Sequence, residues 1–322
     1  MNTQETLNEV EKVFEESEKE LFQSNKEKFK ELSPGDLKDI LGLTIKKDNE
    51  NKLITFLCQL STYTEDSQFN IIFNAPSSSG KSYIPTEIAK LFPNEDVMEI
   101  AYCSPTAFFH DTGKYNEERK SLDMDLSRKI LIFLDQPHSQ LLERLRPLLS
   151  HDKKEILIKI SDKNGKGGLR TKNVYIKGFP SVIFCSANTN IDEQESTRSV
   201  LLSPDIDQEK LREGILEKIK YEVDKDSYKN TLKENPERIL LKERVLEIKK
   251  LHIKDIKIYD EELIKQLFLK DKKTLKPRHQ RDVGRFISII KKQIPANEIK
   301  NINFYTPTNC CFGCYQVALF ET

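Results

Sequence analysis

Residues 75–82, APSSSGKS, have the composition of a phosphate-binding loop. They follow the short apolar run 69–73 and precede a stretch with helical spacing, which is the strand, loop, helix context that this motif requires. Small residues let backbone N–H groups approach a phosphate, and the start of a helix adds a favourable dipole for anions. We predict a site for the phosphates of ATP, formed by Ala75, Pro76, Ser77, Ser78, Ser79, Gly80, Lys81 and Ser82.

Two side chains of this loop carry its chemistry. Lys81 is expected to neutralise the β- and γ-phosphates, and the Ser82 hydroxyl is expected to bind Mg²⁺. Ala75 stands where the pattern has its first glycine, and an alanine is tolerated there if its φ stays negative. Gly80 is harder to replace because the backbone must approach phosphate closely. The plainer alternative is a chance GKS triplet after a serine-rich turn.

A carboxylate follows a second apolar run. Residues 129–137, KILIFLDQP, place Asp135 at the carboxyl end of a predicted central strand, where it could hold Mg²⁺ through water. The next residue is Gln136, whereas working ATPases of this kind commonly have a glutamate that polarises the attacking water. Glutamine orients water but accepts no proton. Two outcomes therefore stay open: slow hydrolysis with a positioned water, or a nucleotide switch with little turnover. A buried strand capped by a polar turn is the structural alternative.

Further polar residues follow the strand predicted at residues 181–186. Asn188 is expected to help orient the attacking water, and Arg198 to reach the γ-phosphate of a neighbouring subunit as an arginine finger. The alternative for Arg198 is a surface arginine paired with Glu195. In the later segment LKPRHQRDVGRF, Arg281 or Arg278 could cover the nucleotide of its own chain.

Residues 155–178 form two alternating arms around a glycine-rich basic tip, which predicts a β-hairpin. The hairpin suits non-specific contact with the DNA backbone, and without aromatic residues at its tip it favours backbone tracking over base stacking. The alternative is a solvated hairpin kept soluble by lysine. The cations expected to contact DNA are Lys159, Lys163, Lys166, Arg170 and Lys172.

Strand-like and helix-like segments alternate around these motifs, which is typical of a parallel sheet wrapped by helices. Strands are predicted at residues 70–73, 97–102, 129–134 and 181–186. The predicted fold class is α/β: a P-loop NTPase sheet flanked by helices, with a β-hairpin inserted before the strand that ends near Asn188 and a C-terminal helical lid. The expected domains are a helical arm (1–35), an ATPase core (36–205), a helical lid (206–294) and an irregular tail (295–322).

Composition narrows the remaining possibilities. The 52 Lys and Arg residues balance the 52 Asp and Glu residues, so any electrostatic argument for nucleic acid must be local. No window has the roughly 18 to 20 apolar residues of a membrane span. Reduced cysteines and a cytoplasmic location are the simplest interpretation of the six scattered thiols. Cys310, Cys311 and Cys314 could supply half of a zinc site, but no second Cys or His pair lies nearby.

Taken in order, APSSSGKS, ILIFLDQ, the hairpin, the strand ending at Asn188, the ESTR segment and the KPRHQRD helix resemble an AAA+ ATPase. The hairpin is similar to the pre-sensor insertion of the helicase-type branch, which includes superfamily 3 and minichromosome-maintenance helicases. GFPSVIFCSANTNIDEQESTRSVLLSPD together with SSSGKS is similar to the helicase-like ATPase part of primase-associated proteins of bacterial and archaeal mobile elements. The resemblance covers residues 36–290 or so and leaves out the arm and the tail.

This resemblance implies a homo-oligomeric ring, expected to be a hexamer, with ATP and Mg²⁺ between subunits and hairpins facing a central channel. It implies a helicase-like motor that acts on DNA in the replication of a mobile element. Ala75 and Gln136 depart from the family pattern. A switch or scaffold that hydrolyses ATP poorly, on DNA or a protein partner, and a protein-remodelling ATPase are the alternatives.

Overall fold

A computed structural model describes residues 29, 32–65, 67–105, 107–109, 113–162, 170–187, 197–251, 261–270, 272, 274–276 and 278–297. Three predicted site residues, Asn188, Lys163 and Lys166, lie outside these ranges, as do most of the expected N-terminal arm and tail.

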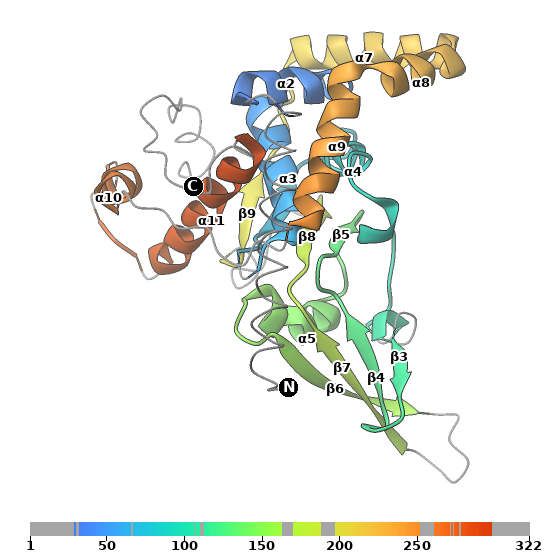
Figure 1. Cartoon of the computed structure of the whole chain (residues 1–322), viewed down its shortest axis with the longest axis vertical. Coiled ribbons are helices and arrows are strands. Elements are labelled where there is room, and N and C mark those ends of the chain that lie inside the picture. Colours follow the sequence, from blue (N-terminus) through green and yellow to red (C-terminus); the bar gives the residue numbers. More distant parts are fainter. Residues whose placement is uncertain are drawn as a thin grey trace, which may run out of the picture.

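A five-stranded parallel sheet forms the centre of the molecule (Figure 1). Its strand order is β2-β5-β8-β1-β9. The four predicted strands are confirmed, with small changes at their ends, and a fifth strand joins them after the segment that carries Arg198. The bounds are β1 Asn70–Asn74, β2 Val97–Ile100, β5 Ile130–Phe133, β8 Ser181–Ser186 and β9 Ser199–Leu202.

Both faces of the three central strands β5, β8 and β1 are buried, which explains why these strands read as continuous apolar runs. Alternate residues of β1 point to opposite faces, so Ile71 and Phe73 enter one core and Ile72 enters the other. The core on the first face includes residues of α2 (Pro34–Gly42), α3 (Asn49–Leu60) and α4 (Tyr83–Ala89). Helix α5 (Ser139–Leu149) covers part of the second face. The α/β class with a parallel sheet flanked by helices is therefore confirmed.

The predicted hairpin is confirmed, but it belongs to a second sheet that the sequence did not reveal. Its arms are β6 (Glu155–Asp162) and β7 (Arg170–Lys177), which pair in antiparallel register. Strand β7 also pairs in parallel with β4 (Ser121–Asp125), which pairs with β3 (Lys114–Asn116). Figure 1 shows this four-stranded sheet extending from the lower end of the molecule. The hairpin arms are thus anchored by other strands.

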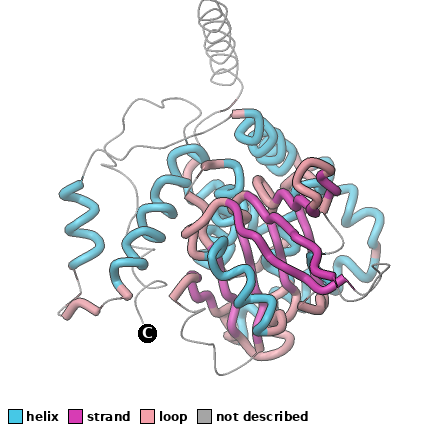
Figure 2. The backbone as a smooth tube through the Cα atoms, turned by 90° about the horizontal axis from the view of Figure 1, so that it is seen from below, coloured by secondary structure: helices cyan, strands magenta, loops and turns pink. Residues whose placement is uncertain are grey.

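The charged segment after residue 205 is helical, as predicted. It forms α7 (Gln208–Val223), α8 (Lys225–Glu234) and α9 (Pro236–Lys250), followed by α10 (Glu261–Leu269) and α11 (His279–Asn297). Leu241, Val245 and Ile248 of α9 and Ile289 of α11 belong to the same core as α3 and β1, so these two helices pack directly on the main body. Figure 2 shows α10 standing to one side of the strands. The domain boundary at residue 205 stays a prediction.

Short 3-10 turns complete the described fold at Ser61–Tyr63, Asn94–Asp96 and Ala107–Phe109. Among the residues that the structure describes, no helix has the length and apolar character needed to cross a membrane. Within the same residues, no group of three or more His, Cys, Asp and Glu side chains is arranged to hold a metal ion.

Candidate nucleotide-binding site

The predicted phosphate loop lies at the carboxyl end of β1. Its first residue is tied to the next strand, because the Ala75 N–H donates to the Ser186 carbonyl at 3.2 Å. Ala75 is buried and does not take a positive φ, as its tolerance there requires. Further along, Ser78 has φ 66° and Gly80 has φ 93°, so the loop uses the left-handed region twice. Gly80 is the residue type that takes this conformation at little cost, whereas Ser78 holds it with some strain.

The loop continues into α4, and one hydrogen bond is missing from the first turn of this helix. Ile84 and Thr86 donate to the carbonyls of Gly80 and Ser82 at 3.0 and 3.3 Å. Pro85 has no N–H, so the Lys81 carbonyl receives no helical donor from it. The Cys185 thiol donates to that carbonyl instead, at 3.4 Å. The proline is therefore accommodated by a donor from the end of β8.

Lys81 and Ser82 point to different parts of the site. The Lys81 ammonium donates to the Pro76 carbonyl at 3.4 Å, so the cation spans the loop from its end to its beginning. The Ser82 hydroxyl donates to the Leu134 carbonyl at 3.5 Å, which brings the loop to the end of β5. The exposed Asp135 follows Leu134 directly. The structure thus brings the predicted phosphate-binding lysine and both predicted magnesium ligands to the carboxyl ends of the parallel strands.

The donor set at this edge fits Mg²⁺. A serine hydroxyl and an exposed carboxylate are hard oxygen ligands, and Mg²⁺ in nucleotide sites takes its remaining ligands from phosphate oxygens and water. Ser82 and Asp135 would hold the ion. Its positive charge would stabilise the negative charge that develops during phosphoryl transfer.

Gln136 is held in place by the neighbouring strand. The Ser186 hydroxyl at the end of β8 donates to the Gln136 carboxamide oxygen at 3.0 Å, and the Gln136 backbone N–H donates to Asp135 at 2.8 Å. Because β8 lies between β1 and β5, Gln136 is oriented from the strand next to the phosphate loop. A glutamate at position 136 would accept a hydrogen bond from the same Ser186 hydroxyl. The local fold can therefore also hold the glutamate that is common at this position in working ATPases.

The thiol at the end of β8 stays protonated. Burial raises the pKa of Cys185 to about 11, and the Asp135 carboxylate adds to the rise, whereas Ser82 and the Lys81 ammonium oppose it. At neutral pH Cys185 is therefore a neutral hydrogen-bond donor to the loop. It is the small buried residue that its position in the strand predicted.

One cation at the loop was not predicted. Lys210, in the first turn of α7, donates to the Ser79 carbonyl at 3.2 Å and to the Asp205 carbonyl at 2.6 Å. Its ammonium also forms an ion pair with Asp48, whose side chain is fully buried. Asp48 accepts in addition from the Asp205 N–H and from Asn51. This buried ion pair fastens α7 to the phosphate loop and to the start of α3.

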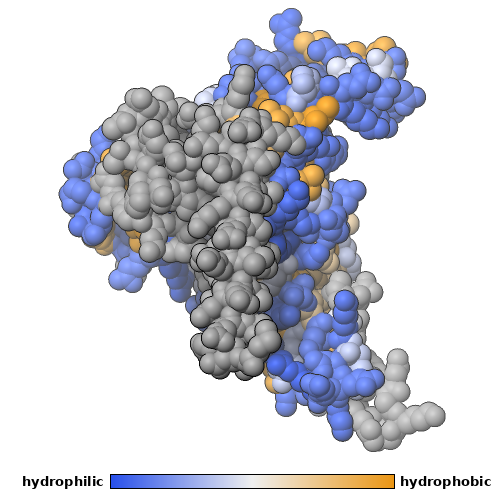
Figure 3. Space-filling view, in the orientation of Figure 1, coloured by the Kyte–Doolittle hydropathy of each residue, from blue (hydrophilic) through white to orange (hydrophobic). Residues whose placement is uncertain are grey.

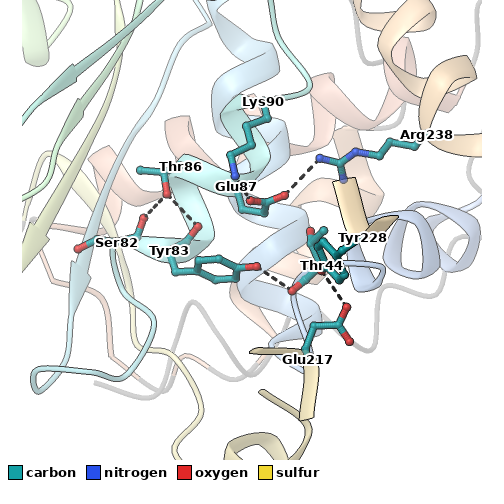
Figure 4. Close-up of polar contacts among 9 residues, drawn as sticks. All are labelled: Thr44, Ser82, Tyr83, Thr86, Glu87, Lys90, Glu217, Tyr228 and Arg238. Atoms are coloured by element: carbon teal, nitrogen blue, oxygen red, sulfur yellow. Dashed lines mark hydrogen bonds and ion pairs between the residues drawn. The ribbon is translucent and has the colours of Figure 1, made fainter. Parts of the chain in front are cut away.

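Polar contacts also join helix α4 to helix α9 (Figure 4). Glu87 of α4 and Arg238 of α9 form an ion pair at 3.3 Å in which both side chains are buried. The Tyr83 hydroxyl donates to the Thr44 carbonyl at 3.1 Å, in the turn that follows α2. Because α4 begins directly after Ser82, the Glu87–Arg238 ion pair joins the helix that follows the loop to α9.

Arg198 and Arg281 lie together, far from the loop of their own chain. Arg198 precedes β9, whose first residue, Ser199, pairs with Asn70 at the start of β1. The loop begins beyond the other end of β1, roughly 13 Å away at about 3.3 Å per residue. The Arg281 guanidinium donates to Thr197 at 3.1 Å. The structure therefore separates Arg281 from the loop that it was expected to cover, and only a second subunit could bring a loop to either arginine.

Other arginines extend this group. Arg285 is largely buried on α11 and bonds Asp282 at 2.8 Å, and Arg278 bonds the same carboxylate at 3.5 Å. Burial lowers the pKa of Arg285 to about 10, Asp282 opposes the shift, and the charges of Arg278, Arg281 and Arg198 add to it. Arg278 and Arg285 thus share Asp282 as their acidic partner. Arg198 is held from α5 by a hydrogen bond to Ser150 at 2.5 Å.

The predicted DNA-contacting residues of the hairpin do not share one face. Lys159 pairs in register with Asn173, and Lys172 with Ile160, so the two lysines lie on opposite faces. Lys159 is exposed and Lys172 half-buried. Arg170 begins β7 opposite Asp162, next to the tip. Lys159 and Lys172 therefore put one positive charge on each face of the described part of the hairpin.

Comparisons with known proteins give only distant likenesses. No protein-family model and no curated protein match this chain. Its structure is similar to a "putative ATPase" from Cytophaga hutchinsonii, with 13% identity, a TM-score of 0.43 and coverage of 88% of this chain and 84% of that one. It is similar to the SCCmec type IV Cch active helicase, with 12% identity, a TM-score of 0.40 and coverage of 83% of this chain and 48% of that one.

A third likeness is to the C-terminal region of NrS-1 in its apo form, with 14% identity and a TM-score of 0.31, covering 84% of this chain and 69% of that one. The chain spans about half the length of the Cch helicase. At these identities and scores the likenesses carry no argument about activity, which must come from the site itself.

Proposed function

We propose that this chain is an ATPase of the AAA+, helicase-like type that binds ATP and Mg²⁺ at residues 75–82. One observation carries the proposal: the hydroxyl of Ser82 bonds the carbonyl of Leu134, which places Asp135 of a different strand beside the phosphate loop. A structural turn that merely contains a GKS triplet would have no reason to meet a carboxylate at a strand end. Phosphate binding and metal-assisted hydrolysis need this combination.

The proposed active unit is an oligomer with ATP between subunits. The loop and the arginines lie at opposite ends of the parallel strands, so the arginine finger of one subunit can serve only the loop of the next. Such a head-to-tail contact closes into a ring when the rotation allows, and we propose a hexamer. The positively charged ends of the hairpins would then contact the backbone of DNA, and the role in replication of a mobile element belongs to this proposal.

ATP hydrolysis by the purified chain, measured with and without single-stranded DNA, tests the proposal. We expect Mg²⁺-dependent turnover that DNA increases. Absence of ATP binding in the presence of Mg²⁺ would refute the assignment of the loop. ATP binding with turnover that DNA leaves unchanged would refute the DNA motor and favour the switch.

Gln136→Glu is expected to increase turnover. The carboxylate can accept a proton from the attacking water, which glutamine cannot, and Ser186 can still orient it. A positioned general base contributes about 10²- to 10⁴-fold. Because Gln136 already orients the water and supplies part of this effect, we expect a smaller rise in kcat, about 10- to 100-fold, at an almost unchanged KM for ATP. Steady-state phosphate release measures both values.

Gln136→Met is the matched control, because it keeps the length of the side chain and removes its hydrogen bonds. Its turnover is expected to fall below that of the wild type if Gln136 positions water. Equal turnover of wild type, Gln136→Glu and Gln136→Met would mean that position 136 has no part in hydrolysis. If the wild type binds ATP without hydrolysing it and Gln136→Glu hydrolyses ATP, the chain acts as a nucleotide switch.

Lys159→Gln combined with Lys172→Gln is expected to weaken DNA binding and its salt dependence. Each lysine that neutralises a phosphate of single-stranded DNA contributes about 0.7 to the slope of log affinity against log salt concentration. The double variant should therefore lose about 1.4 from this slope, measured by fluorescence anisotropy over a salt series.

Lys153→Gln with Lys154→Gln makes the same change of charge at the base of the hairpin, where both side chains are exposed. This control should leave the slope near its wild-type value. If the two double variants lower the slope equally, the end of the hairpin is no special DNA contact.

A further inference from the structure

Lys210 holds one peptide unit of the phosphate loop in a fixed orientation. Its ammonium donates to the Ser79 carbonyl at 3.2 Å, and its side chain is only 13% exposed. No described peptide is cis, and in a trans peptide the N–H points opposite to the C=O of the same unit. The Gly80 N–H is therefore turned away from Lys210. Within the described ranges this N–H donates to no acceptor, so it is available to a phosphate oxygen.

The same peptide unit could turn over easily without that contact. A reversal changes ψ of Ser79 and φ of Gly80, which is 93° in this structure. Glycine populates positive and negative φ about equally, so Gly80 itself opposes the reversal very little. The reversed peptide would present the Ser79 carbonyl oxygen where the Gly80 N–H now points, and its partial negative charge would repel a phosphate. The Lys210 cation favours the unreversed state by binding that oxygen.

Asp48 fixes the position of the Lys210 cation. Its side chain is fully buried, forms the ion pair with Lys210, and accepts from the Asp205 N–H at 2.8 Å and from Asn51 at 2.9 Å. Asp48 and the preceding Lys47 both lie in the left-handed region, with φ 49° and 54°. Non-glycine residues keep such a backbone only where their surroundings hold it, often at functional sites. Lys210 is therefore placed by a rigid, buried partner.

The remaining contacts of α7 with the body are more exposed. Three ion pairs at 3.1, 3.7 and 3.2 Å join it to the turn after α2, namely Glu209 and Glu213 with Lys47, and Glu217 with Lys46. The helix buries no residue, and Figure 3 shows apolar surface at the end of the molecule where Figure 1 places α7. Among the described ion pairs of α7, the one between Lys210 and Asp48 is the most buried. Exposed pairs contribute little, whereas breaking a buried pair is costly.

We propose that Lys210, held by Asp48, is a positioning residue that keeps the Ser79–Gly80 peptide turned so that the Gly80 N–H faces a phosphate of the bound nucleotide. The inference rests on the proposed function, because it concerns the same loop and the same ligand. It adds a residue outside the loop motif, on the first helix of the helical segment. Its cation acts on a carbonyl of the loop and prepares the loop for phosphate.

Lys210→Met combined with Asp48→Asn tests this role. The double variant removes the cation and its counter-charge together, so no buried charge is left unpaired, and the asparagine oxygen can still accept from Asp205 and Asn51. A peptide that is free to turn loses one hydrogen bond to a charged phosphate. We therefore expect the dissociation constant for ADP with Mg²⁺ to rise by about 10- to 100-fold in isothermal titration calorimetry.

The matched control loosens α7 without touching Lys210 or the loop. Glu209→Gln combined with Glu213→Gln and Glu217→Gln removes the carboxylates that meet the turn after α2, and glutamine keeps the helix propensity of glutamate. The dissociation constant of this triple variant for ADP should stay within a few-fold of the wild-type value.

A spectroscopic signal reports the orientation of the peptide directly. Ser79–Gly80 is the only Ser-Gly pair in the sequence. Cell-free synthesis with carbonyl-¹³C serine and ¹⁵N glycine therefore selects a single amide signal in a carbonyl-filtered NMR spectrum. In the wild type we expect the Gly80 amide proton to move downfield when ADP and Mg²⁺ saturate the site. The double variant should lose this shift even at saturating ADP, which a purely structural role of Lys210 would not cause.

Several results would overturn the inference. They are an unchanged dissociation constant in the double variant, an equal rise in the triple variant, or a Gly80 shift that the saturated double variant keeps. A wild type that binds ADP without moving the Gly80 signal would also overturn it, and that spectrum is decisive even if the double variant does not fold. A wild type that binds neither ATP nor ADP refutes the nucleotide site itself, which separates the two proposals.

Discussion

Lys81→Ala is expected to reduce ATP affinity by about 100-fold or more, and with it all hydrolysis. The ammonium spans the loop between its own helix end and Pro76, at the place where two phosphates would lie. Hydrogen bonds to charged groups are worth about 1.5 to 3 kcal/mol each, and each 1.4 kcal/mol is a factor of ten in affinity. Isothermal titration calorimetry with ATP and Mg²⁺ measures the loss directly.

Lys90→Ala is the control for this result. Lys90 lies at the end of the same helix and is exposed, and its partner Glu87 keeps the ion pair with Arg238 when Lys90 is removed. Its ATP affinity should stay within a few-fold of the wild type. If Lys81→Ala binds ATP as the wild type does, phosphate is bound elsewhere and the assignment of residues 75–82 is wrong.

The local parts of the site could be predicted from the sequence. The loop and the acidic strand are contiguous motifs, and a buried parallel strand next to each follows from its apolar run. Their meeting at one edge follows from topology, because parallel strands end at the same side of the sheet. The tolerance of Ala75 also depends on backbone conformation alone. These predictions needed no knowledge of contacts between distant residues.

Contacts across long separations could not be predicted. Lys210 reaches Ser79 over 131 positions in the chain, and nothing in the amphipathic pattern of α7 says which face meets the body. Cys185 meets the Lys81 carbonyl because Pro85 leaves it without a donor, a consequence of two segments that are 104 positions apart. Strand β4, SLDMD, alternates apolar and polar residues too briefly to predict its pairing with β7.

Arg281 shows how the same limit affects a predicted site residue. Its sequence position after the helical segment suited an arginine that covers the nucleotide of its own chain. The hydrogen bond to Thr197 places it beside Arg198 instead. Both residues then lie at the end of the strands away from the phosphate loop. A mixture of two variant subunits tests whether they act on the nucleotide of a neighbouring subunit.

Arg198→Ala is expected to abolish most hydrolysis while ATP affinity stays within a few-fold of the wild type. An arginine finger stabilises charge that develops in the transition state and contributes about 10³- to 10⁵-fold to turnover. The exposed Arg119, which pairs with Glu155 on the second sheet, provides a control as Arg119→Ala and should retain wild-type turnover. Phosphate release and calorimetry together separate hydrolysis from binding.

Mixing subunits decides whether the arginine acts on the neighbouring chain. Arg198→Ala and Lys81→Ala subunits are each expected to be inactive alone, since one lacks the finger and the other the phosphate-binding cation. In an equal mixture, about a quarter of head-to-tail contacts join an intact loop to an intact arginine, so up to about a quarter of wild-type turnover should return. Loss of the Ser150 hydrogen bond in Arg198→Ala could also lower activity through the fold, but a damaged subunit would not be rescued by a partner that supplies only an arginine. Failure of the mixture to recover activity would contradict the assignment of Arg198 as an arginine finger between subunits.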